Sequence, residues 1–130
     1  MIHSFGVLTT LSAQRIVVAS TSNAFKVQYP DTVTSLPIGI TKDTVLDTTS
    51  GIEVAGVGEI AKLYFNDTVT SGGLVGSDSS GRGIPFALAA TSTSISAPAA
   101  YLGVLLGPTI GLTGTIAEVL IQPGFDRKSA

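Results

Sequence analysis

The sequence predicts a mainly β fold: a small antiparallel β-barrel or tulip-like domain with an extended N-terminal arm and little helix. Two observations predict this class. Short apolar runs rich in β-branched residues recur along the chain and are separated by clusters of Gly, Ser, Asp and Asn, which is typical of meandering antiparallel strands. Helical periodicity is weak throughout, and the best helix candidate is a short alanine-rich piece at residues 86–90.

The composition indicates a surface with few charges. Hydrophobic residues make up 44% of the 130 residues and charged residues only 12%, against a usual charged share of about 25%. Much of the surface must therefore be Ser, Thr, Gly and Ala, or be covered by neighbouring proteins. A net charge of −2 argues against a nucleic-acid partner. The absence of cysteine excludes disulfides and thiolate metal sites.

Neither a signal peptide nor a membrane segment is expected. Residues 1–14 contain no continuous apolar core and no basic region of the kind that opens a secretory signal. Residues 84–116 carry no charge, but Pro85, Pro98 and Pro108 interrupt them. The best apolar block of this span, residues 101–106, is far shorter than the ~20 residues that a spanning helix needs. We therefore expect a soluble protein.

Three parts are expected along the chain: an arm at residues 1–14, one β-barrel-like domain at residues 15–124, and a flexible tail at residues 125–130. The arm mixes apolar residues with Thr and Ser and has no helical period. An extended arm can add a strand to the sheet edge of another chain, and a frayed terminus is the alternative.

Strands are expected within the domain at residues 15–20, 25–29, 36–41, 52–54, 57–65, 101–106 and 115–122. A two-residue apolar step at residues 74–75 and an apolar run at residues 84–88 lie between turns. Gly39 inside the strand at residues 36–41 indicates close approach of another backbone, or a bulge. Residues 77–83 are expected to form a hairpin turn in which Asp78 caps its own backbone and a glycine adopts a positive φ.

One internal similarity stands out. Residues 38–40, Ile-Gly-Ile, precede an alternating strand that contains Glu53 and Val54, and residues 102–104, Leu-Gly-Val, precede one that contains Glu118 and Val119. Two related hairpins of this kind would form the two halves of a small barrel and so remove exposed sheet edges. Chance similarity between strands is the alternative.

Residues suited to catalysis or metal binding do not cluster in the sequence. His3 is the only histidine and lies in the expected arm, so neither a nucleophile with its base nor a metal site is expected. Residues 31–78 carry seven acidic residues and two lysines, a net charge of −5, and the rest is net +3. This asymmetry fits an ordinary solvated face or oppositely charged faces of neighbouring subunits. We expect no enzyme, no catalytic residues and no cofactor.

Several glycine-punctuated segments resemble a known family. Residues 66–83, 102–104 and 116–124 are similar to the strand, hairpin and closing strand of the head decoration (capsid cement) proteins of tailed bacteriophages. Residues 36–40 and 51–63 also match the earlier part of that pattern, so the resemblance covers about residues 36–124. The sequence departs from the family at Gly73, where members usually carry Asp or Asn.

The resemblance implies a structural virion protein that binds the outer surface of the mature phage head and stabilises contacts between major capsid proteins. It implies the major capsid protein and further copies of itself as partners, commonly in a homotrimer, with no nucleic acid and no membrane. Synthesis in the host cytoplasm and residence on the capsid exterior would follow. The alternatives are another virion β module, such as a tail or fibre component, or a small β-barrel ligand-binding domain.

Two sets of apolar residues are the candidate contact sites. The arm would pair with a strand of the capsid subunit, and a charge-free segment at residues 101–112 would supply apolar contacts, either in the protomer core or between protomers. The arm set is Ile2, Phe5, Val7, Leu8 and Leu11. The segment set is Tyr101, Leu102, Val104, Leu105, Leu106, Ile110 and Leu112.

Overall fold

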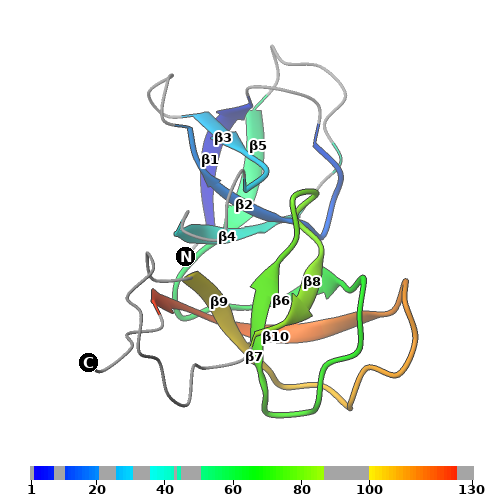
Figure 1. The fold of residues 1–130 in the computed structure, drawn as a ribbon. Helices are drawn as coiled ribbons and strands as arrows, with labels where there is room; N and C mark the ends of the chain where they lie inside the picture. The colour runs from blue at the N-terminus through cyan, green and yellow to red at the C-terminus, as the bar shows by residue number, and fades with distance from the viewer. Residues whose placement is uncertain are drawn as a thin grey trace, which may run out of the picture.

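The computed structural model describes residues 2–7, 11–20, 26–30, 36–42, 44, 51–86 and 100–125. Within these residues every regular element is a strand and none is a helix, which confirms the predicted fold class. The strands form a closed five-stranded barrel and a second five-stranded antiparallel sheet, which lie one above the other in Figure 1. Most of the helix candidate at residues 86–90 lies outside the described residues.

The first barrel closes in the order β1-β3-β2-β4-β5, with β5 pairing back to β1. Its strands are β1 (Ile2–Val7), β2 (Ile16–Ala19), β3 (Lys26–Gln28), β4 (Pro37–Thr41) and β5 (Gly51–Ala55). Strands β1 and β3 run parallel, and all other neighbours run antiparallel. In β5, Ile52 and Val54 are buried while Gly51 and Glu53 are exposed, which is the period-2 pattern that predicted the strand.

The second sheet has the order β6-β10-β9-β7-β8. Its strands are β6 (Ile60–Tyr64), β7 (Leu74–Ser77), β8 (Gly83–Pro85), β9 (Ala100–Leu105) and β10 (Ile116–Phe125). The sheet curls until its two edge strands meet at one parallel bridge between Phe65 and Gly83. Beside that bridge, the Asn66 amide donates a hydrogen bond to the Gly83 carbonyl (2.9 Å). The sheet is therefore almost a second barrel.

The two sheets share one topology. We number the five strands of each sheet in sequence order and read their neighbours around the sheet. Both sheets then have the order first, third, second, fourth and fifth, and in both the first and third strands meet in parallel. The registers also agree. Ile16 and Val17 of β2 lie opposite Ile40 and Gly39 of β4, and Leu74 and Val75 of β7 lie opposite Val104 and Gly103 of β9.

The internal similarity seen in the sequence thus marks equivalent hairpins, β4–β5 and β9–β10. The expectation that they form two halves of one barrel is wrong, because each hairpin belongs to a different sheet. Each pairs with strands that precede it in its own half of the chain. Pairing within a half closes shorter loops, which costs less conformational entropy than pairing across the whole chain.

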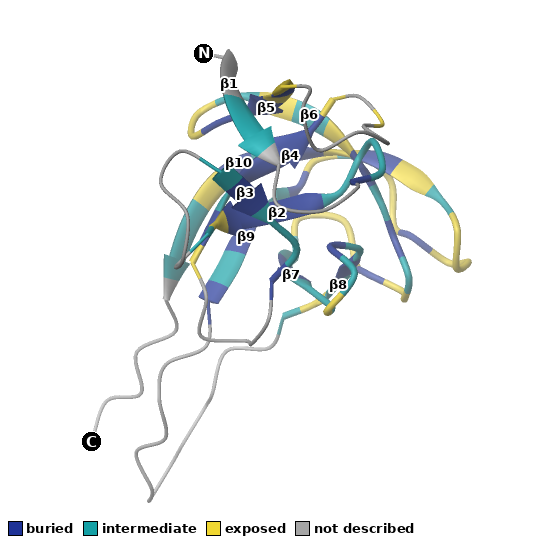
Figure 2. Cartoon of the chain, turned by 90° about the horizontal axis from the view of Figure 1, so that it is seen from above, coloured by how far each residue is buried: buried dark blue, intermediate teal, exposed yellow. Residues whose placement is uncertain are grey.

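Two apolar cores hold the sheets. The smaller one fills the first barrel and includes Leu11, Val17, Val27, Ile52 and Val54. The larger one fills the concave side of the second sheet and includes Ile16, Ile40 and Ala55 from the outer side of the first barrel. Figure 2 shows the resulting alternation of buried and exposed residues along β10. Because one core reaches both sheets, the two are packed as a unit.

Residues 14–16, at the start of β2, connect β6 with the turn that precedes β8. The Gln14 carbonyl accepts a hydrogen bond from the Tyr64 amide (2.9 Å), and the Ile16 amide donates one to the Gly81 carbonyl (2.6 Å). The Arg15 guanidinium lies 4.3 Å from the centre of the Tyr64 ring, a cation–π contact. The first barrel therefore supplies hydrogen-bond partners for main-chain groups that the incomplete closure of the second sheet leaves unpaired.

Candidate contact surfaces

Residues 2–7 of the expected arm form β1, a strand of the first barrel. β1 pairs with β5 over five consecutive residues, from Ile2 opposite Ala55 to Gly6 opposite Gly51, instead of extending away from the domain. Phe5 packs against the barrel core, and Leu11 is 1% exposed inside it. Leu8 lies outside the described residues. Leu11 is therefore part of the barrel core, and Phe5, which is half-buried, packs against that core.

The segment at residues 101–112 divides between core and surface. Leu102, Leu105 and Ile110 are buried in the larger core, the first of the two roles foreseen for this segment. Tyr101 and Val104 are half-buried, and the ring of Tyr101 stands 5.4 Å from that of Phe86.

Leu106 and Leu112 are 48% and 76% exposed. They are the members of the set whose side chains are most available to another protein.

A second exposed apolar surface was missed by the sequence analysis. On the convex side of the β6–β10 ladder, Tyr64 lies opposite Ile116, Lys62 opposite Glu118, and Ile60 opposite Leu120. Ile60 and Ile116 are 56% and 45% exposed. The alternation within residues 57–65 and 115–122 indicated that one face of each strand points outward. It did not indicate that the two faces adjoin, because that depends on the β6–β10 pairing.

Two shallow grooves flank this surface. One, of about 290 Å³, lies where β6 meets the first barrel and includes Gln14, Lys42 and Ile60 in its lining. The other, of about 430 Å³, lies under the β9–β10 connection and includes Pro108, Thr115 and Ile116. Lys62 and Glu118 line both. Both grooves are open and have a mixed polar and apolar lining.

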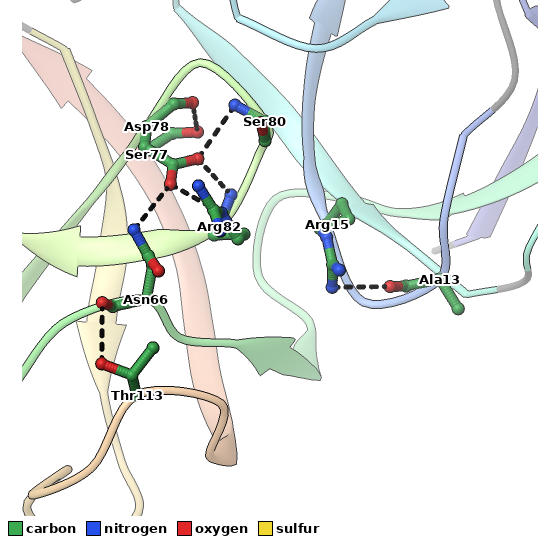
Figure 3. A network of polar contacts seen from close by, with 8 residues as sticks. All are labelled: Ala13, Arg15, Asn66, Ser77, Asp78, Ser80, Arg82 and Thr113. Atoms are coloured by element: carbon green, nitrogen blue, oxygen red, sulfur yellow. Dashed lines mark hydrogen bonds and ion pairs between the residues drawn. The ribbon is translucent and has the colours of Figure 1, made fainter.

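The turn between β7 and β8 has the predicted conformation (Figure 3). One oxygen of Asp78 accepts hydrogen bonds from the Ser80 and Arg82 amides (both 2.9 Å). The other accepts from the Arg82 guanidinium (2.8 Å) and the Asn66 side chain (3.2 Å). Gly81 has a φ of +75°. With four donors on its carboxylate, Asp78 organises the hairpin and has no free lone pair for a cation.

The described residues contain no group of three or more His, Cys, Asp or Glu side chains that could hold a metal ion. In the same part of the chain, no helix is long and apolar enough to cross a membrane.

The fold defines a class of protein, an all-β chain of two similar five-stranded units. A solved structure with this fold is the N base of head fiber gp8.5 in bacteriophage phi29. The similarity has a TM-score of 0.66 and covers 94% of this chain and 93% of that one, at 10% sequence identity. Similarity at so low an identity shows a shared fold. No family model and no curated protein sequence matches the chain.

Proposed function

We propose that this protein is a non-enzymatic structural component attached to the head of a bacteriophage. One observation carries the proposal: the fold matches a phage head fibre base over nearly the full length of both chains. The resemblance of residues 36–124 to phage head decoration proteins points to the same location independently of the structure.

In its finer form, the proposed function is that of a capsid cement protein. The protein would bind the outer surface of the mature head as a homotrimer and stabilise contacts between major capsid proteins. A charge-poor surface supports this, because Ser, Thr, Gly and Ala are covered by neighbours at a smaller desolvation cost than charged side chains. Binding only to the mature lattice stabilises that lattice by mass action, without chemistry.

A second candidate is the base of a head fibre, which anchors an appendage rather than clamping the shell. The structural similarity favours it, since the matched protein is itself a fibre base. Both candidates share attachment to the head. They differ in whether binding makes the shell more stable.

The test is to mix the purified protein with expanded phage shells that lack it, and with unexpanded shells as the comparison. Electron cryomicroscopy would locate the added density, and thermal dissociation would measure shell stability. Density on the outer surface near the three-fold positions, with a raised dissociation temperature, supports the cement function. Bound density with an unchanged dissociation temperature supports the fibre base. Absence of binding to either shell would contradict head attachment.

Exposed apolar residues of the 101–112 segment are the proposed capsid contacts. Leu112→Asp should weaken shell binding while leaving folding intact, because this side chain is 76% exposed. The matched control is Val57→Asp, which changes a side chain that is 70% exposed but lies in the turn before β6. Co-sedimentation with shells measures both. Equal binding by the two variants would remove Leu112 from the contact.

A further inference from the structure

Strand β6 lies at an edge of the second sheet, and its main-chain groups alternate between two sides. The Glu59 carbonyl accepts a hydrogen bond from the Ile121 amide (2.9 Å), and the Phe65 amide donates one to the Thr115 carbonyl (2.9 Å). Main-chain groups alternate in direction along an antiparallel strand. The odd-numbered residues from 59 to 65 therefore direct their amides and carbonyls toward β10, and the even-numbered residues direct theirs toward the outer edge of the sheet.

That outer edge has a main-chain partner at one position. The Tyr64 amide donates a hydrogen bond to the Gln14 carbonyl (2.9 Å), which confirms the outward direction of the even-numbered residues. Ile60 and Lys62 face the same side, and within the described part of the chain no main-chain group bonds to them there. The edge thus offers the amide and the carbonyl of two residues for hydrogen bonds to a further strand.

A groove runs beside these unpaired groups. It is the groove of about 290 Å³ between β6 and the first barrel, lined by Ile60, Ala61 and Lys62 on one side and by Thr41 and Ala55 on the other. Ile60 and Lys62 are both exposed. An extended peptide adds to a sheet at an exposed edge of this kind. Because the first barrel forms the opposite wall, the groove suits a single extended segment better than the edge of another folded sheet.

The other edge strand of the second sheet, β8, is protected against such pairing. The Phe86 amide bonds to the Leu74 carbonyl (3.1 Å), so the preceding residue, Pro85, faces away from β7. Proline has no amide to donate, and its position on an edge prevents a further strand from pairing. β6 contains no proline, so both outward amides of its edge are available.

We propose that the outer edge of β6 binds an extended segment of the capsid shell, which joins the second sheet as an additional strand. The amides and carbonyls of Ile60 and Lys62 would pair with the main chain of that segment, and the exposed Ile60 side chain would pack against an apolar side chain on it. The inference rests on the proposed function, and it names a surface of this chain that meets the shell.

A proline at position 62 tests the pairing. Lys62→Pro removes an outward amide and takes no donor from the β6–β10 ladder, and Lys62→Ala is the matched control, because it removes the same side chain and retains the amide. Co-sedimentation of each full-length variant with expanded shells that lack the protein measures binding. Lys62→Pro should bind at least about 10-fold more weakly than Lys62→Ala, because a hydrogen bond is lost and the proline ring blocks the added strand.

Equal binding by the two folded variants would overturn this inference and leave head attachment intact. Absence of shell binding by the wild type would contradict the proposed function and this inference with it. If thermal unfolding shows that Lys62→Pro is not folded, hydrogen exchange of the wild type decides. Shell binding should slow exchange in the peptide that spans residues 60–62, and unchanged exchange would overturn the proposal. So would a dimer in solution that Lys62→Pro dissociates and Lys62→Ala does not, because the edge would then pair with a second copy.

Discussion

Single glycines determine how closely the strands of this protein approach one another. A Cβ atom at Gly39 would overlap the Ala55 carbonyl oxygen, and one at Gly103 would overlap the Leu120 carbonyl oxygen. These two glycines are equivalent in the two halves, and each lies opposite the fifth strand of its own sheet. Gly39 confirms the expectation that a glycine inside a strand indicates close approach of another backbone.

Gly39→Ala and Gly103→Ala should each lower the free energy of unfolding by about 1–3 kcal/mol, because the overlapping atom is backbone and cannot rotate away. Urea unfolding followed by circular dichroism measures the change. Gly111→Ala is the control, since a Cβ there meets nothing within 4 Å. It should alter stability by no more than about 0.5 kcal/mol. Equal stability of all three variants would contradict the close packing.

Asp78 is the other residue on which local structure depends. Asp78→Ala would leave the amides of Ser80 and Arg82 without their acceptor, so we expect a loss of about 1–3 kcal/mol in unfolding free energy. Asp78→Asn retains an acceptor for these amides and should cost less. Asp67→Ala is the control: Asp67 is exposed, and its carboxylate accepts the amide of the next residue, Thr68. Thermal unfolding of the three variants ranks the effects.

At the scale of elements, β1 is the strand that the sequence analysis assigned to an arm and that the structure pairs with β5. Its residues follow no pattern that separates a strand of the chain's own barrel from an arm that pairs with another protein. In both cases the segment is extended and its main chain forms a ladder. The choice depends on whether β5 presents an open edge, and β5 lies more than forty residues further along the chain.

Removal of residues 1–7 should therefore unfold the first barrel instead of releasing a functional domain. The deletion would leave the β5 main chain unpaired over five residues and open the barrel between β5 and β3. Circular dichroism and limited proteolysis of the truncated protein measure the loss. A truncated chain that unfolds cooperatively at the wild-type temperature would show that β1 contributes little to the barrel.

At the scale of the whole molecule, the two halves are joined by a shared core and by main-chain hydrogen bonds. Ile16, Ile40 and Ala55 belong to the core of the second sheet although they lie on strands of the first barrel. Gln14 accepts a hydrogen bond from Tyr64 of β6, and Ile16 donates one to Gly81 in the turn before β8. We infer that the halves fold as one cooperative unit, although their topology would allow two.

Ile40→Ala tests this coupling, because Ile40 is fully buried where the halves meet. The expected loss is about 2–5 kcal/mol in a single transition. Hydrogen exchange of amides in β3 and in β8 should report the same destabilisation. Leu36→Ala, at an exposed position just before β4, should change stability little. Separate transitions for the two halves would contradict a shared core.

The sequence by itself determined the fold class, the approximate positions of the strands, the Asp78 hairpin and the significance of Gly39. These features depend on the alternation of neighbouring residues, on turn chemistry and on glycine geometry, all of which act within a few residues.

Only the tertiary structure decided that β1 closes the barrel, and that Leu102, Leu105 and Ile110 are core residues while Leu106 and Leu112 are exposed. The reason is physical. Strand pairing and burial result from contacts between segments far apart in the chain. A local pattern shows that a strand has two different faces, but it does not show what packs against either face.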